Sequence, residues 1–517
     1  MCPKCFFLLT NALLCAIICA LTVKYVTGGQ STVVLGDSRH PLAGRMSDKV
    51  SSALGYYFVV IGLFVLQEVE MESEAFEKLP PTSLFFKCAV PSMITMAFGA
   101  LYQIADGLFV GRFIGEDALA AINLIMPIIM TIFAFSNMIA TGASVRMSIL
   151  LGEKKREEAS RVFSFSCKVI LIISCLLGVA GLVLAEPFVR LIAPGATEEA
   201  ISYGITYIQM YAAFCPLLLL SHATDNYLRV CGRERLSMWL GIISQLLNIV
   251  LDVILIAFLG QGVWAAAFTS CIAMALCAVV SLLMFRGGRM DVYYTRENMR
   301  PRDFLSVLAN GSSEFFSNIS MSVMSVVFNL FLLKYGGTTG VAAFSVIMYV
   351  DSIIGMLVFG MCDAMQPAIS YCYGAGLIEK VRAIVLRIIA GAVVLSVASM
   401  LFMMFAGRYV APLFVRPEDT ELLAVSIVGM ELFSLSYLTG WVDMLFSSLF
   451  TALERPARSL ITSFFGTIVF PVAFLFILPS MWGLNGVWLT SLAATFMSSL
   501  LTLVLVFTMK KKTKLAE

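Results

Sequence analysis

The sequence predicts an all-α integral membrane protein with about twelve membrane-spanning helices. Of its 517 residues, 60% are hydrophobic and only 13% are charged, and its mean hydropathy is +0.92. A soluble protein would carry about 25% charged residues. From Leu84 onward, apolar runs of about 20 or more residues, enough to cross a bilayer as helices, recur between short polar connections. The predicted helices cover residues 84–110, 118–148, 160–184, 198–226, 236–259, 263–285, 303–333, 340–372, 381–406, 421–450, 458–479 and 485–508.

Basic residues are concentrated in every second connection between these helices. The basic set holds Arg146, Lys154, Lys155, Arg156, Arg161, Arg229, Arg233, Arg235, Arg286, Arg289, Arg296, Arg300, Arg302, Lys380, Arg382, Arg387, Arg455, Arg458 and the tail from Lys510 to Lys514. The alternate set holds only Arg112, Arg190, Lys334, Arg408 and Arg416. Because cytoplasmic loops are enriched in Lys and Arg, the basic set is predicted to be cytoplasmic. Both ends of the twelve-helix core are then cytoplasmic, in a multi-pass protein of the plasma (inner) membrane.

The two halves of the chain look like repeats. Three pairs of short motifs, each pair 222–224 residues apart, are Leu119-Ala-Ala-Ile-Asn with Val341-Ala-Ala-Phe-Ser, Ser148-x3-Gly152 with Ser370-x3-Gly374, and Gly262-Val-Trp264 with Gly486-Val-Trp488. Six helices per half is an even number, so both halves start on the same side and the repeats are parallel. We predict an N-lobe (71–285), a cytoplasmic inter-lobe loop (286–302), a C-lobe (303–509) and a basic cytoplasmic tail (510–517).

The N-terminal extension, residues 1–70, has three possible interpretations. Its apolar runs, Cys5–Val23 and Ala53–Val69, could be a signal-like segment or one or two extra spans. Alternatively, translation starts at Met71, because the polar residues that follow resemble an ordinary cytoplasmic lead-in to the first core helix. We favour the start at Met71.

Cysteine and histidine usage argues against a metal site or a metalloenzyme. The 13 cysteines lie mostly within apolar runs, and Cys2-x-x-Cys5 has no second pair. The only histidines are His40 and His222. We therefore expect no structural metal, no cofactor and no disulfide. Clustered Ser, His and acidic groups that an intramembrane enzyme would need are also missing, and no basic tract is long enough for nucleic acid.

The first core helix carries two unusual residues for a membrane span. Asp106 places a carboxylate in hydrocarbon, which costs about 3 kcal/mol even on lenient scales. Pro91 frees a backbone carbonyl and permits a bend. A bendable helix with a titratable acid suits an ion-driven transporter, although a structural acid bonded between helices is an alternative.

A second polar group lies in the fifth and sixth helices. Asn248 and Asp252 are four residues apart, on one face of a helix whose neighbouring residues are aliphatic. Thr269 and Ser270 offer hydroxyls in the next helix. With Asp106, these side chains would form an oxygen-rich pocket for a hard monovalent cation or for protons shared between two acids. The alternative is an interhelical hydrogen-bond network without a transport role.

The sequence resembles the multidrug and toxin extrusion (MATE) transporters from Leu84 to Met509. The residues that carry the resemblance are Asp106-Gly-Leu-Phe-Val-Gly-Arg-Phe-Ile-Gly with Ala118-Leu-Ala-Ala, Gly152-Glu-Lys-Lys, Leu228-Arg-Val-Cys-Gly-Arg, Asn248-x3-Asp252 and Gln366-Pro-Ala-Ile-Ser-Tyr-Cys-Tyr-Gly-Ala. The resemblance implies two six-helix lobes in a V. It also implies efflux of cationic, amphipathic compounds, driven by entry of sodium ions or protons.

By position, the resemblance assigns roles to the residues of the first lobe. Pro91 matches the bend proline and Asp106 the coupling acid of the first helix. The fifth-helix pair is matched by Asn248 and Asp252, and Ser270 falls where a sixth-helix hydroxyl is expected. Tyr102, one turn before Asp106, completes the predicted site. One departure is Gly99, where some members carry glutamine.

Acidic and amide groups of the second lobe are secondary candidates. Asp443 matches a carboxylate that binds cations in some members, but the usual tyrosine one turn earlier is Thr439. Asp351 lies in the interior of its helix, where a cleft-facing role and a structural role are both open. Gln366 either lines the cleft or reaches toward the interface. We therefore predict that ion coupling lies in the first lobe.

The predicted function is a secondary active antiporter, not an enzyme, that exports cationic amphipathic drugs or toxins. Its coupling ion is H⁺ or Na⁺, its surroundings are the lipid bilayer, and it is expected to be a monomer. The main alternative is a flippase of the same superfamily for lipid-linked oligosaccharides. Such a flippase would need a strongly basic cleft for an anionic head group, and the spans hold few basic residues.

Overall fold

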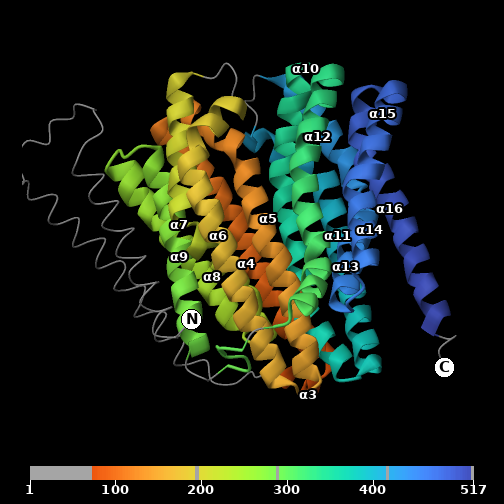
Figure 1. Ribbon diagram of the computed structural model, residues 1–517. Coiled ribbons are helices and arrows are strands. Elements are labelled where there is room, and N and C mark those ends of the chain that lie inside the picture. The colour runs from red at the N-terminus through yellow and green to blue at the C-terminus, as the bar shows by residue number, and fades with distance from the viewer. Residues whose placement is uncertain (1–72, 193–196, 287–289, 298, 415–418, 514–517) are drawn as a thin grey trace, which may run out of the picture.

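The computed structural model describes residues 73–192, 197–286, 290–297, 299–414 and 419–513, within which every regular element is a helix (Figure 1). The N-terminal extension (residues 1–70) and the predicted translation start, Met71, lie outside these residues. The elements are α3 (Ala75–Lys78), α4 (Pro81–Phe109), η1 (Val110–Ile114), α5 (Glu116–Gly152), α6 (Arg156–Ile192), α7 (Glu198–Val230), α8 (Glu234–Asp252), η2 (Val253–Phe258), α9 (Val263–Arg286), α10 (Pro301–Gly374), α11 (Ile378–Phe414), α12 (Thr420–Ser434), α13 (Tyr437–Ala452), α14 (Pro456–Phe464), η3 (Phe465–Val469), α15 (Phe470–Trp482) and α16 (Leu484–Thr513), where η denotes a π-helix.

The longest element, α10, is two antiparallel spans joined at Gly337. A straight helix of its 74 residues would be about 110 Å long, far more than the roughly 30 Å hydrocarbon core. Gly337 interrupts it with a left-handed backbone (φ 60°, ψ −155°). Both ends of α10 return to the same half of α5: Val307 lies against Gly142, and Tyr371 lies against Gly152. The arms 301–336 and 338–374 are therefore the predicted seventh and eighth spans.

The tenth predicted span, residues 421–450, is bent rather than continuous. Helices α12 and α13 meet at an angle of 52°. At the break, the Ser436 amide donates to the Phe433 carbonyl (2.9 Å), a tight i to i−3 bond. The Ser434 hydroxyl donates to the Glu431 carbonyl (2.7 Å), and such local side-chain bonds compete with the helix ladder.

The number of spans agrees with the sequence prediction. In the described part of the chain, ten helices are long and apolar enough to cross a membrane, or eleven if α12 and α13 form one bent span. Because α10 crosses twice, the total is the twelve predicted passes. Helices α4 to α9 form the N-lobe, and α10 to α16 form the C-lobe.

The backbone itself carries the predicted internal repeat. Eight of the described residues have a positive φ, and they fall into four pairs whose members are 222 or 223 residues apart. The pairs are Gly115 with Gly337, Lys154 with Gly376, Gly232 with Glu454, and Gly260 with Gly483. Each marks a turn between consecutive spans, so the two lobes repeat one chain path, including its turns.

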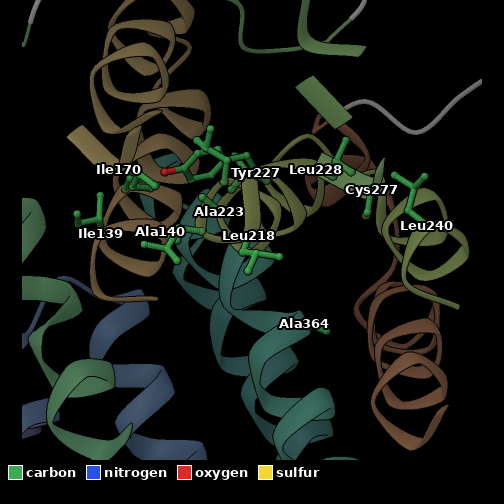
Figure 2. Close-up of a cluster of buried hydrophobic side chains, with 14 of the residues drawn as sticks. Ile139, Ala140, Ile170, Leu218, Ala223, Tyr227, Leu228, Leu240, Cys277 and Ala364 are labelled. Atoms are coloured by element: carbon green, nitrogen blue, oxygen red, sulfur yellow. The ribbon is translucent and has the colours of Figure 1, made fainter. Parts of the chain in front are cut away.

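The two lobes share a hydrophobic core at one end only. We call the end that carries the basic connections the basic end, and the opposite one the far end. One buried cluster joins N-lobe residues to basic-end residues of the C-lobe such as Met365 and Phe450. Figure 2 shows part of this cluster, which includes Leu218 of α7 and Ala364 of α10. The far half of the C-lobe has a separate core around Trp488 and Met430.

Glycines bring the lobes into backbone contact at the basic end. A Cβ added to Gly142 of α5 would lie 2.0 Å from the Val307 carbonyl oxygen, and one on Gly311 of α10 would lie 1.8 Å from the Met138 carbonyl oxygen. Similarly, a Cβ on Gly374 would lie 2.2 Å from the Ile149 carbonyl oxygen. No side chain fits at these positions, so α5 and both arms of α10 meet main chain to main chain.

The short helix α3 bridges both lobes at the basic end. Phe76 is fully buried, and its ring packs edge-on against Tyr371 of α10. Lys154, in the turn after α5, donates to the Tyr371 hydroxyl (2.9 Å) and to Glu77 (2.9 Å). These two hydrogen bonds raise the pKa of the Lys154 ammonium. Helix α3 therefore takes part, with the two lobes, in the contact between them at the basic end.

Candidate functional site

Two carboxyl groups lie at the centre of the candidate site in the N-lobe. Asp106 is in the last turn of α4, and Asp252 is the final residue of α8. Their side chains interact directly with each other. Asp252 is fully buried and Asp106 is partly buried. One oxygen of each, Oδ1 of Asp106 and Oδ2 of Asp252, is buried without a hydrogen-bond donor. The two predicted acids are therefore brought together.

Neutral polar groups extend this pair into a connected network. Thr269 Oγ1 of α9 donates to Asp252 Oδ1 (2.5 Å). The Asn248 amide donates to Ser270 Oγ (3.0 Å), with a longer contact to Thr269 Oγ1 (3.4 Å). The Tyr102 hydroxyl hydrogen-bonds with Ser270 Oγ (3.0 Å). All predicted polar residues of the first-lobe site lie in this network. Thr269, which the sequence offered only as one of two hydroxyls, is the residue that contacts Asp252.

Both acids stand next to a local change in helix geometry. The π-helix η1 begins four residues after Asp106, and η2 begins directly after Asp252. The two π-helices contact each other. Wide π-turns are rare and occur frequently at functional sites, because they reposition the groups around them. The sequence did not predict either segment, since both lie in apolar runs that are compatible with an ordinary helix.

Tyrosines of α7 are part of the site's surroundings that the sequence analysis missed. Tyr207 is buried and lies within electrostatic range of Asp106. Its ring stacks on Tyr211, with ring centroids 5.0 Å apart. A signal was available: Tyr203, Tyr207 and Tyr211 recur at four-residue spacing, which places them along one face of a helix. Phenol groups add further polar atoms to the wall of the site.

Pro91 lies on a segment of α4 that packs closely on both lobes. The Thr95 hydroxyl donates to the Pro91 carbonyl (3.0 Å). A Cβ on Gly241 of α8 would lie 2.7 Å from the Thr95 methyl group, and one on Gly360 of α10 would lie 3.2 Å from the Ser92 carbonyl oxygen. A bend at Pro91 would therefore change contacts to both lobes.

At Gly99, where some family members carry glutamine, a glutamine amide from another helix lies close by. A Cβ at Gly99 would lie 3.5 Å from Nε2 of Gln245, a residue of α8. The Oε1 atom of Gln245 is buried without a hydrogen-bond partner. Gln245 is one turn before Asn248, so a glutamine amide stands beside the network although position 99 has none.

The second-lobe candidates are held separately. Asp351 accepts a hydrogen bond from the Tyr437 hydroxyl (2.8 Å). Asp443 accepts one from Thr502 Oγ1 (3.1 Å). Gln366 is buried, and its amide contacts Ser448 Oγ (3.3 Å). Among the described contacts, these three candidates do not join one network, in contrast to the first-lobe residues.

Comparison with known proteins agrees with this architecture. The MatE family model matches residues 91–254 and 315–477, one segment in each lobe and more than half of the chain. Multidrug export protein MepA of Staphylococcus haemolyticus is 25% identical over 428 residues, which cover 82% of this chain and 93% of MepA.

Solved structures show the same fold. A multidrug resistance MATE family transporter of the MOP superfamily, in an outward-facing conformation, is 26% identical, with a TM-score of 0.78 over 86% of this chain and 100% of that chain. A MATE in the bent conformation is also 26% identical, with a TM-score of 0.77 over 86% of this chain and 99% of that one. The twelve passes, the repeated lobes and these matches confirm the predicted resemblance: the chain belongs to the MatE family of multidrug efflux transporters.

Proposed function

We propose that this protein is an antiporter in which entry of protons or sodium ions drives export of cationic, amphipathic compounds. The observation that carries the proposal is the buried Asp106–Asp252 pair with its network of hydroxyl and amide groups. Carboxylates inside a membrane protein are costly and commonly mark ion pathways. One oxygen of each acid lacks a hydrogen-bond donor, so the pair can accept a proton or a cation.

The site has the chemistry to bind a small cation reversibly. Two negative charges in contact within a medium of low dielectric repel strongly. A proton shared between Asp106 and Asp252, or a sodium ion beside them, would remove that repulsion and satisfy the unpartnered oxygens. The unpartnered Oδ1 of Asn248 and the hydroxyl oxygens nearby are neutral ligands of the kind that hard cations prefer.

Ion binding can be coupled to the shape of α4. Asp106 and Pro91 lie on the same helix, and Pro91 has no amide hydrogen to complete the helix ladder. Neutralising the pair would change how the end of α4 packs against α8, and the proline permits that change as a bend. Related MATE structures are described in a bent and in a straight conformation. The ion shifts the equilibrium only as far as its affinities for the two states differ.

The state of the lobes fits an exporter after delivery of its cargo. We propose that the basic end faces the cytoplasm, following the distribution of Lys and Arg, in the plasma (inner) membrane. The lobes share a core at that end and have separate cores toward the far end. This arrangement corresponds to an outward-facing state, in which bound cations can exchange with the exterior. We expect the protein to act as a monomer.

Proteoliposomes test the proposal directly. The purified protein is reconstituted, and ethidium efflux is measured under a sodium gradient alone and under a proton gradient alone. We expect one gradient to drive efflux and the Asp106→Asn variant to lose that response. Asp443→Asn is the matched control, since it removes a carboxylate from the other lobe. Antiport is wrong if neither gradient drives flux, and the assigned site is wrong if Asp106→Asn transports like the wild type.

A further inference from the structure

A buried arginine at the basic end connects the two lobes. The sequence analysis placed Arg229 in a cytoplasmic connection, but its side chain is only 5% exposed near the end of α7. Its Nη1 donates to Asp363 of α10 (2.6 Å), which belongs to the C-lobe. Its Nη2 donates to Asp225 of α7 (2.7 Å), and its Nε donates to Ser237 of α8 (3.3 Å), both in the N-lobe. One planar guanidinium thus satisfies three separate groups on three helices.

The Arg229–Asp363 ion pair is better shielded from water than Arg146–Glu454, the other described ion pair between the lobes. Arg146 and Glu454 are 3.5 Å apart, with side chains 37% and 31% exposed, whereas Asp363 is 20% exposed. Exposed ion pairs contribute little, because water and salt screen them. Breaking a buried pair is more costly, since it leaves a charge without a partner. The Arg229–Asp363 contact therefore contributes more to closure than Arg146–Glu454.

The partners of Arg229 are distributed unequally between the lobes. If the lobes separate at the basic end, Arg229 keeps Asp225 and Ser237, which belong to its own lobe. Asp363 loses its only described hydrogen-bonding partner, and Glu314 lies within electrostatic range of it. Opening therefore removes the only described hydrogen-bonding partner of the C-lobe carboxylate, while Arg229 keeps two of its three partners.

We propose that the Arg229–Asp363 ion pair is a conformational latch that holds the basic end closed, and that opening this end requires Asp363 to give up Arg229. This inference rests on the alternating two-lobe motion of the proposed function. It concerns a site at the opposite end of the N-lobe helices from Asp106. Removing the charge of Asp363 should release the latch, while removing that of Asp225 should leave the cross-lobe contact in place.

Distance measurements between the lobes test the latch. Spin labels are attached at Glu158→Cys in the N-lobe and Glu379→Cys in the C-lobe, two exposed positions near the basic end. The background is a variant whose native cysteines are replaced and whose unfolding temperature matches that of the wild type. Double electron–electron resonance then gives the distance distribution in lipid. Asp363→Asn should increase the population of the long-distance, open form about tenfold relative to the parent. Asp225→Asn is the matched control, and we expect it to retain the parent distribution.

A second variant separates latch release from general destabilisation. Arg229→Lys keeps the charge, but one ammonium cannot reach three partners as the guanidinium does. We expect it to open the basic end partially, with an unchanged unfolding temperature. The latch is wrong if Asp363→Asn and Arg229→Lys both keep the parent distances. It is also wrong if Asp225→Asn opens the end as much as Asp363→Asn. Because this readout needs neither an ion gradient nor cargo, it is independent of whether antiport itself is demonstrated.

Discussion

The N-lobe and the C-lobe repeat one chain path but use their acidic residues differently. In the N-lobe, Asp106 and Asp252 come from two helices, interact directly and share one polar network. In the C-lobe, Asp351 and Asp443 each have a separate hydroxyl partner. The comparison shows that a repeated scaffold does not imply a repeated arrangement of acidic residues.

The repeat offset explains why the C-lobe lacks a second acid pair. Residues 222–224 positions after Asp252 are Phe474, Leu475 and Phe476, which are all apolar. Residues 222–224 positions after Asp106 are Phe328, Asn329 and Leu330, none of which is acidic. The C-lobe acids therefore occupy positions unrelated to those of the N-lobe pair, and we expect their roles to differ as well.

The largest effect is expected from neutralising one acid in each lobe. Asp252→Asn should lower ion-driven ethidium efflux about 100-fold, because the asparagine cannot gain or lose charge with the coupling ion; this lies within the usual range of coupling between sites. Asp443→Asn, the counterpart in the C-lobe, should change efflux less than about threefold. Initial rates in proteoliposomes with equal protein content measure both. Equal losses in the two variants would abolish the contrast between the lobes.

A smaller effect is expected from removing the hydroxyl beside each acid. Thr269→Val removes the donor to Asp252 Oδ1 and leaves that oxygen unsatisfied. A hydrogen bond to a charged group typically contributes about 1.5–3 kcal/mol, so the ion concentration for half-maximal efflux should shift about tenfold or more. Thr502→Val removes the donor to Asp443 and should leave that concentration unchanged. Efflux measured over a series of ion concentrations gives both values, and an unshifted Thr269→Val curve would contradict a role of Thr269 in ion binding.

The smallest effect is expected at Asp351. Tyr437→Phe removes one hydrogen bond to this carboxylate and keeps the aromatic ring. We expect the unfolding temperature in detergent to fall by about 2 °C, as for loss of a single hydrogen bond in a large protein, with efflux unchanged. Thermal unfolding followed by fluorescence measures the shift. A clear loss of efflux with unchanged stability would instead give the second lobe a direct role in transport.

The sequence predicted the passes well and the interruptions poorly. Hydropathy located all twelve spans because each must be apolar over the bilayer thickness. The bend between Ser434 and Tyr437 was missed, because the apolar run continues through it without proline or glycine. The π-helices after Asp106 and Asp252 were missed for the same reason: one extra residue in a turn leaves no mark on composition.

For the candidate sites, contacts between residues far apart in the chain were the hardest feature to predict from the sequence. The convergence of Asp106 with Asp252 was predicted, since intramembrane acids require partners and the family resemblance supplied the positions. Arg229 was assigned to a connection by its charge and its place near a helix end. Its burial depends on Asp363, which lies 134 residues further along the chain. No local pattern in the sequence indicates that pairing.

The glycine contacts described for the basic end have a mechanical consequence. Where Gly142 and Gly311 meet the backbone of the opposite helix, no rotamers must be frozen as the lobes come together, and no side chain can yield. In the motion proposed above, this contact would act as a hard stop that limits how far the lobes can close. The extent of closure would then be set by main-chain geometry, independently of the compound that is transported.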